Sequence, residues 1–218
     1  MSKAKAYDLA AAAPFILLFA FALGGLYLQV LRETATQAPS LQLLLWIGSK
    51  LVAAVFIGFQ IVLFVIRRLP LAMSPGWLPR IVAAAGSSSA TLFLALPPAP
   101  PSESLSILSS LLTITGTAGA IVAIGYLGRS FSIMPQARGL VSRGPYRRIR
   151  HPLYLAEQVA SLGIMLQYRQ PWSLLAFAAG LLLQIPRIHY EEEVLSDAFP
   201  AYRAYIATVT TRLIPGVY

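Results

Sequence analysis

Residues 41–66 read LQLLLWIGSKLVAAVFIGFQIVLFVI, an apolar run with one charged side chain, Lys50. This run is longer than the roughly 20 helical residues that cross ~30 Å of hydrocarbon. The whole chain has the same character, because 57% of its residues are hydrophobic, 11% are charged and its mean hydropathy is +0.68. Charge this sparse cannot cover the surface of a water-soluble globule of 218 residues. The sequence therefore predicts an integral membrane protein.

Six apolar runs predict an all-α bundle of about six transmembrane helices. The runs extend from Pro14 to Leu31, Leu41 to Ile66, Ile81 to Leu96, Leu105 to Leu127, Pro152 to Gln167 and Trp172 to Ile185. Most are close to the length that spans a bilayer, whereas the fifth and sixth are short and suit a tilted helical hairpin. The prolines of residues 97–101 are expected to end the third helix and to form a stiff turn. A count of five spans is the alternative.

Lysines and arginines are unequally divided between the two predicted faces. With six spans, all but three of the 17 fall on one face; the other face holds Arg32 and Arg169, and Lys50 lies inside a span. The positive-inside rule places the cation-rich face and both termini in the cytoplasm, and the expected location is a prokaryotic cytoplasmic membrane. Five spans would move the C-terminal tail to the opposite face. Topology accounts for the net charge of +9, so we expect membrane lipids and no nucleic acid as partners. The oligomeric state is not indicated.

Composition excludes several kinds of site. The chain has no cysteine and two histidines, His151 and His189, which excludes disulfides, thiolate metal sites and a histidine-rich metal centre. No G-x-G-x-x-G motif follows a strand pattern, so a nucleotide-bearing cofactor cannot be held in the Rossmann manner. We therefore expect no metal site and a different grip on any such cofactor.

The chain divides by role into two parts that are expected to fold as one unit. Residues 1–127 are interpreted as a transmembrane scaffold of about four helices, and residues 128–218 as the part that carries the chemistry. The second part begins with an arginine loop, residues 129–150, which holds six arginines and no acid. After two more apolar runs, Arg187 is followed by the acids of residues 191–193. We expect the loop and these glutamates to meet at the cytoplasmic face.

A further helix is expected after the sixth span. Pro186 should end that span, so that the glutamates lie in the first turns of the following helix, where carboxylates favour the helix dipole. Apolar and aromatic side chains then recur at steps of three and four, at Val194, Leu195, Ala198, Phe199, Tyr202 and Tyr205. This spacing predicts a C-terminal amphipathic helix on the cytoplasmic membrane surface.

Four groups of residues in the second part form one combined pattern. They are Leu140 to Tyr146 (LVSRGPY), Arg150 to Tyr154 (RHPLY), Arg187 with Glu191, Glu192 and Leu195, and the tail positions Phe199, Tyr202, Tyr205, Ile214 and Pro215. The pattern covers about residues 125–216 and resembles the isoprenylcysteine carboxyl methyltransferase family, which is grouped with the phospholipid N-methyltransferases of membranes. The resemblance implies S-adenosylmethionine in a pocket formed by the loop, the last two spans and the tail. It also implies a lipid substrate that enters sideways from the bilayer.

The side chains of this pattern suit the parts of S-adenosylmethionine. Its carboxylate needs a cation or a donor, which Arg138, His151 and Tyr154 can provide. Its amine and ribose need acceptors such as Glu191 or Glu192, and its adenine needs a slot such as Tyr146 and Pro152 would form. The expected cofactor-binding set is Arg138, Leu140, Gly144, Tyr146, Arg150, His151, Pro152, Tyr154 and Glu192. The prenylcysteine enzymes usually have a histidine where this chain has Arg138, so that contact is either lost or made by the arginine.

The expected roles in catalysis follow from the acceptor. A carboxylate acceptor needs only orientation, and Arg187 at the cytoplasmic end of the last span is placed to clamp it. An amine or thiol acceptor must lose a proton, and Glu191 or Glu192 is the expected base. Glu157 is costly facing lipid, so it should face the bundle interior, either as a substrate-binding residue beside Arg187 or as a partner of Lys50. The sequence does not identify the acceptor.

Two alternatives belong to other functional classes. Membrane reductases resembling the sterol reductases share an RHP-x-Y segment followed by a glutamate, as Glu157 follows here, and use NADPH. The acids after Arg187 favour the methyl donor, because carboxylates suit an aminoacyl sulfonium better than a 2′-phosphate. A non-catalytic transporter would carry ionisable residues in several spans, and apart from Lys50 and Glu157 the spans have none.

Overall fold

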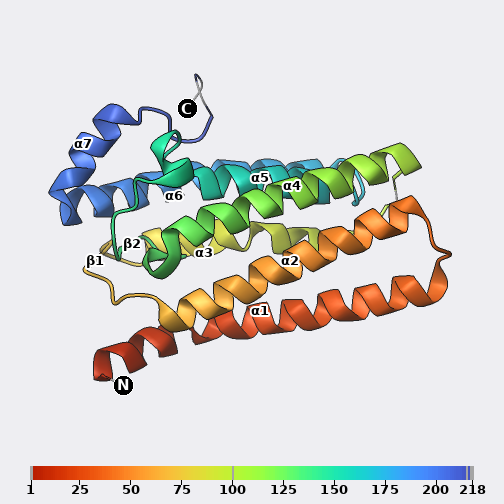
Figure 1. Cartoon of the computed structure of the whole chain (residues 1–218), viewed down its shortest axis with the longest axis horizontal. Helices are drawn as coiled ribbons and strands as arrows, with labels where there is room; N and C mark the ends of the chain where they lie inside the picture. The colour runs from red at the N-terminus through yellow and green to blue at the C-terminus, as the bar shows by residue number, and fades with distance from the viewer. Residues whose placement is uncertain (1, 100, 215, 217–218) are drawn as a thin grey trace.

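The computed structural model describes residues 2–99, 101–214 and 216. Pro100, in the predicted stiff turn, and Pro215, in the tail of the motif pattern, lie outside the described residues. The chain forms an elongated bundle of helices that run back and forth between two ends, as Figure 1 shows. The predicted all-helical fold is confirmed.

Some helices pack against the next helix in the sequence, and others against a helix that is more distant in it. The long ones are α1 (Lys3–Thr36), α2 (Leu41–Ile66), α4 (Glu103–Leu127) and α6 (Trp172–Ala198), with shorter α3 (Leu78–Ser87), α5 (Pro152–Met165) and α7 (Pro200–Thr208). Helix α1 packs on α2, α2 on α4, and α4 on α5, while α6 lies against both α3 and α5. Their common core includes Leu63, Phe64, Ile124, Phe131, Leu153 and Ile188.

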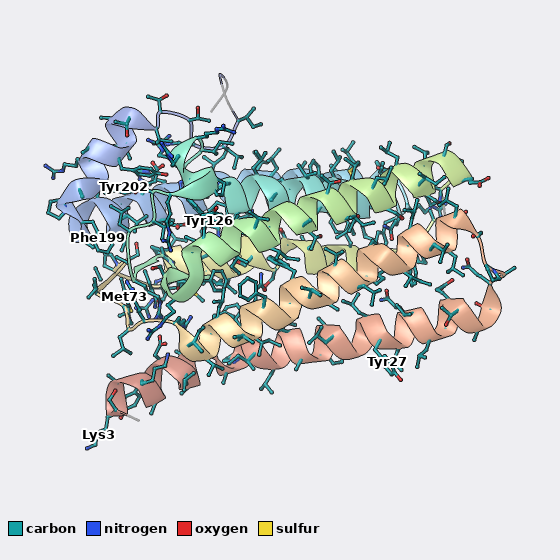
Figure 2. The ribbon with its side chains drawn as sticks, in the orientation of Figure 1. Lys3, Tyr27, Met73, Tyr126, Phe199 and Tyr202 are labelled. Carbon is teal, nitrogen blue, oxygen red and sulfur yellow. The ribbon has the colours of Figure 1, made fainter. Side chains whose placement is uncertain are left out.

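Three helices within the described residues are long and apolar enough to cross a membrane. They are Lys3–Thr36, Leu41–Ile66 and Glu103–Ser130, and they correspond to the first, second and fourth predicted spans. In Figure 2 the labelled Tyr27 points outward from α1, as expected for a helix that meets lipid along most of its surface. The remaining predicted spans are not identified as such helices.

The other three runs depart from the prediction for separate reasons. The third run is divided into α3 and a 3-10 segment, η1 (Ser89–Ala95), at a stretch of serines whose side chains compete for backbone groups. There Ser89 Oγ donates to the carbonyl of Gly86 at 2.8 Å. Helix α5 has 14 residues and is about 21 Å long, shorter than the hydrocarbon core. Helix α6 is long, but its last turns are charged.

The prediction that Pro186 ends the sixth helix is wrong. Helix α6 continues through Pro186 to Ala198, so the glutamates lie in its last turns and not at the start of another helix. The proline costs the helix one hydrogen bond, while the buried Ile188 and Glu192 on the following turns keep it packed. Carboxylates at this end oppose the helix dipole and therefore need cationic partners.

The single amphipathic helix predicted for the C-terminal region is also not observed. Phe199 stands between α6 and α7, and Pro200 begins the new helix at a position where its missing N–H is not needed. The residues of the predicted apolar stripe are thus shared between two helices. Tyr202 and Tyr205 of α7 pack together with Val209 in a small separate core.

The two ends of the bundle differ in composition. At one end lie the N-terminus, α7, and a ribbon in which β1 (Ala72–Met73) pairs antiparallel with β2 (Gln136–Ala137), as Figure 1 shows. Figure 2 shows side-chain nitrogens gathered at this end, around the labelled Lys3 and Met73. The opposite end holds short connections, where the amide of Arg169 donates to the carbonyl of Pro97 at 3.2 Å. The predicted separation of charge therefore exists along the bundle, while its orientation to the cytoplasm stays a prediction.

Close packing of α4 on α5 fixes where α5 begins. A side chain on Gly116 of α4 would overlap the backbone of Ala160, and one on Gly163 of α5 would overlap that of Ser109. The Ser109 hydroxyl donates to the carbonyl of Gly163 at 2.7 Å. Small residues let the two backbones touch, which sets the position of the residues at the start of α5.

Candidate active site

The arginine loop is shaped by a glycine and held by α7. Gly144 has a φ of +59°, a conformation that side chains disfavour, and a Cβ there would overlap the ring of Tyr126. The short 3-10 turn η3 (Gly144–Arg147) that follows turns Tyr146 inward, where it is buried. Tyr205 donates its hydroxyl to the carbonyl of Tyr146 at 2.7 Å. Burial raises the pKa of Tyr205 to about 12, so this hydroxyl keeps its proton at neutral pH.

The RHP segment, residues 150–152, is paired with the tail. The amide of Arg150 donates to the carbonyl of Thr211 at 3.0 Å, and the amide of His151 to that of Arg212 at 2.9 Å. Pro152 then begins α5, where its fixed φ suits the first helical position. These bonds give Arg150 and His151 a defined backbone although they lie outside any helix.

Glu192 joins this segment to α6. Its Oε1 lies 3.1 Å from His151 Nε2 and 2.9 Å from Arg150 Nε, and its Oε2 accepts from Arg212 Nε at 3.1 Å. The Arg150 Nε is not aligned for a hydrogen bond to this carboxylate, so that contact is an ion pair. Burial acts to raise the pKa of Glu192, but the hydrogen bond from His151 and the charges of Arg150 and Arg212 outweigh it and lower that pKa. Glu192 is therefore an anion at neutral pH, and it holds the three side chains in place.

A second cluster lies deeper, between α5 and α6. Tyr154 donates its hydroxyl to Glu191, and its ring stacks on that of His151 with centroids 5.3 Å apart. The guanidinium carbon of Arg187 lies 4.1 Å from the centre of the Tyr154 ring. Arg187 is 3% exposed, and its nearest carboxylate oxygen, on Glu157, is 3.7 Å away. Its Nη1 donates to Gln184 Oε1 at 3.4 Å, while its Nε has no hydrogen-bond partner among the described residues. A buried cation with spare donors is a candidate ligand-binding group.

A narrow hollow, partly open to solvent, lies between the arginine loop, α5, the end of α6 and α7. Six of the predicted site residues line it: Leu140, Tyr146, Arg150, His151, Tyr154 and Glu191. The Tyr146 hydroxyl is buried with no hydrogen-bond partner among the described residues. Burial, with the nearby charges of Glu191 and Glu157, raises the pKa of Tyr146 well above its ordinary value. The hollow thus combines a guanidinium, a carboxylate, an imidazole and several hydroxyls with apolar walls.

Comparison with protein-family models finds a match over the part of the chain that forms the hollow. Residues 104–201, from the first turn of α4 to the first turn of α7, match the model of the phospholipid methyltransferases. This segment is similar to the phospholipid methyltransferase family. The resemblance expected from the sequence is confirmed at this level, and it supports a membrane methyltransferase; the isoprenylcysteine-specific subtype stays a prediction. No curated protein matches the chain.

Within the phospholipid methyltransferase segment, the other predicted site residues lie around the hollow and not on its wall. Glu192 contacts Arg150 and His151, which line the hollow. Gly144 and Pro152 fix the backbone conformation before and after these two residues. Arg187 and Glu157 lie behind Tyr154. Glu157 faces the interior as expected, but its cationic partner is Arg187, whereas Lys50 lies 5.0 Å from the centre of the Trp46 ring.

Arg138 does not face the hollow of this phospholipid methyltransferase segment. Its side chain is 0% exposed and is held by Asp8 of α1, with Arg138 Nη2 2.6 Å from Asp8 Oδ1. It also donates to Gln136 Oε1 at 2.6 Å and to the carbonyl of Arg68. Because Asp8, Gln136 and Arg68 accept its hydrogen bonds, the guanidinium of Arg138 has a structural role. The position that the prenylcysteine enzymes give to a histidine is thus used here to tie the loop to the scaffold.

Sequence reasoning missed Asp8 and the small polar residues Ser130, Ser132 and Gln136 of the loop. Asp8 also accepts from Arg67 Nε at 3.0 Å, so one acid holds cations from α2 and from the loop. A signal existed, because Asp8 is a lone acid at the start of an apolar run on the cation-rich face. No comparable signal marks the loop serines, which line the hollow only because β2 pairs with β1.

Proposed function

We propose that this chain transfers a methyl group from S-adenosylmethionine to a lipid-like acceptor, with the methyl donor held in the hollow beside the arginine loop. The observation that carries the proposal is the meeting of Arg150 with Glu192, at 2.9 Å, beside a hollow that Arg150 and Glu191 line, within the segment that matches the phospholipid methyltransferase model. Members of this family generally use S-adenosylmethionine. The opposite charges of that molecule require both signs in one place.

The residues of the hollow fit this molecule. The guanidinium of Arg150 and the partnerless hydroxyl of Tyr146 are donors for its carboxylate. The carboxylate of Glu191 is an acceptor for its amine or its ribose. The side chains of Leu140 and Leu195 offer apolar surface for its adenine. Neither a metal nor a Rossmann glycine loop is required by this assignment.

The chain's own residues position the acceptor and manage its proton. When bound, S-adenosylmethionine supplies a methyl group on a positively charged sulfur. Arg187 orients the acceptor, because the Nε of its buried guanidinium has no partner among the described residues. If the acceptor carries a proton, Glu191 takes it, since Glu192 has a lowered pKa and three partners and is the poorer base.

A lipid-like acceptor suits the place of Arg187. This side chain packs against α3, where a Cβ on Gly86 would lie 3.3 Å from Arg187 Cδ, so it lies inside the bundle, directly behind Tyr154 of the hollow wall. An acceptor with an apolar tail could reach it from the membrane while its polar end meets Arg187 and Glu157. The polar end can be a carboxyl, an amine or a thiol. The reaction would take place at the cation-rich end of the bundle, which we assign to the cytoplasm.

The decisive experiment compares two ligands on the purified full-length chain in detergent. S-adenosylhomocysteine at about 100 times its Kd should stabilise the fold by about 2.7 kcal/mol, which raises Tm by roughly 5–10 °C for a chain of this size. NADPH should have no effect. Stabilisation by NADPH in place of S-adenosylhomocysteine would support the reductase alternative and defeat the proposal.

Matched arginine variants of the same loop locate the site. Arg150→Ala should lose most of the shift that S-adenosylhomocysteine produces, because Arg150 lines the hollow. Arg143→Ala removes the same charge from an exposed position outside the hollow and should keep the shift. An equal loss in both variants would mean that charge in general, and not this hollow, is responsible.

A further inference from the structure

A second concave surface lies at the cation-rich end, outside the hollow. It is formed where the start of α1 meets the end of α2 and the first residue of the arginine loop, and it includes Lys5, Arg68 and Arg129 with Val65, Ile66 and Leu69. None of these residues lines the hollow. We call this surface the α1–α2 crevice.

The cations of the crevice exceed the acids that could neutralise them. Asp8 is held by Arg67 and Arg138, with Lys5 Nζ 3.8 Å away. Arg68 and Arg129 are exposed, and no acid among the described residues forms an ion pair with either. Two guanidinium groups therefore stand beside a carboxylate that is already saturated.

Both arginines have a fixed backbone. The amide of Arg68 donates to the carbonyl of Arg129 at 2.8 Å, and the carbonyl of Arg68 accepts from the buried Arg138. Arg129 Nε donates to the carbonyl of Ile66 at 3.0 Å, which holds its guanidinium at the end of α2. This arrangement reduces the entropy that is lost when a ligand orders the Arg129 side chain, and it fixes the position from which the Arg68 side chain extends.

Apolar side chains continue directly from these cations. Val65, Ile66 and Leu69 are 48%, 45% and 39% exposed, and Val65 and Ile66 form the end of α2, a helix that is long and apolar enough to cross a membrane. The exposed side of α2 continues with Val62, which is 51% exposed. A free phosphate would match the cations alone, whereas a phospholipid would match the cations with its headgroup and the apolar side with its acyl chains.

We propose that the α1–α2 crevice is a binding site for an anionic phospholipid, distinct from the acceptor and methyl-donor sites. Its phosphate lies between Arg68 and Arg129, and its acyl chains follow the exposed side of α2. The bound lipid would fill the surface where α1, α2 and the loop meet, next to the cluster of Asp8 that holds them together.

Native mass spectrometry of the full-length protein in detergent tests this site with phosphatidylglycerol as the probe and phosphatidylcholine as the zwitterionic comparison. Each surface cation contributes roughly fivefold to the affinity for an anionic lipid. Arg68→Gln should weaken phosphatidylglycerol binding about fivefold, and Arg68→Gln with Arg129→Gln about 30-fold. The single variant carries the test if the double variant unfolds, since Arg129 also bonds to the end of α2.

The matched control is Arg147→Gln with Arg148→Gln, which removes the same charge from exposed positions of the loop outside the crevice. It should change phosphatidylglycerol binding less than twofold, and a large excess of inorganic phosphate should not displace the lipid. The proposal fails if wild type binds both lipids equally, if the control loses as much as the crevice variants, or if phosphate displaces the lipid. Failure here leaves the methyl-donor hollow untouched, because its ligand is tested separately.

Discussion

Replacing Asp8 by asparagine removes the one acid that holds two buried guanidinium groups. The side chains of Asp8, Arg67 and Arg138 are 7%, 5% and 0% exposed, so neither arginine can recover its lost partner by turning to water. Removing one member of a buried ion pair typically costs about 3–5 kcal/mol, because the remaining charge is left uncompensated. We expect Asp8→Asn to reach this range.

The measurement is thermal unfolding of the purified protein in detergent. At roughly 2–4 °C per kcal/mol for a chain of this size, the expected fall in Tm is about 6–20 °C. Glu103→Gln is the control, since this exposed acid lies in the first turn of α4 and its loss should cost at most about 1 kcal/mol. Adding Arg138→Gln to Asp8→Asn should recover part of the loss. Equal effects of the Asp8 and Glu103 variants would refute the claim that this cluster holds the loop to α1.

Three further predictions concern α4, α5 and α6. Arg187→Ala should abolish methyl transfer from labelled S-adenosylmethionine while the protein still inserts and folds; near-wild-type turnover would remove Arg187 from the site. Glu192→Gln should also abolish turnover. Because the pKa of Glu192 is lowered in the folded state, wild type should lose stability as pH falls below the ordinary glutamate value of about 4.5, and this loss should be smaller in the variant; identical acid unfolding curves would contradict this. Gly116→Ala should cost about 1–3 kcal/mol by forcing α4 away from Ala160, whereas Gly119→Ala meets ordinary contacts and should unfold at nearly the wild-type temperature.

The sequence alone was sufficient to predict features that depend on a local pattern of residues or on charge. The apolar runs of α1, α2 and α4 are long enough to be identified without any tertiary information. The ion pair between Arg150 and Glu192 could be expected from charge. Arg150 lies in a loop that has no acid, Glu192 lies in a run of glutamates, and both segments are predicted on the same face. The roles assigned to them in catalysis stay predictions.

The errors arose where tertiary contacts overrule local preference. Pro186 should end a helix by its own chemistry, but the contacts of Ile188 and Glu192 on the next turns keep α6 continuous. The motif left open whether Arg138 contacts the cofactor, and Asp8, far away in the sequence, pairs with its guanidinium. No pattern in a single sequence identifies such a partner, because the pairing depends on how α1 lies against the loop.

The backbone pairing between the RHP segment and residues 211–212 has a consequence for biosynthesis. Arg150 and His151 leave the ribosome well before Thr211 and Arg212, which supply the carbonyls that fix them. The three long apolar helices α1, α2 and α4 can therefore form before the backbone of Arg150 and His151, on the wall of the hollow, is fixed. A chain that ends before residue 211 would lack the two carbonyls that fix Arg150 and His151, so this edge of the hollow is completed only after the bundle has formed.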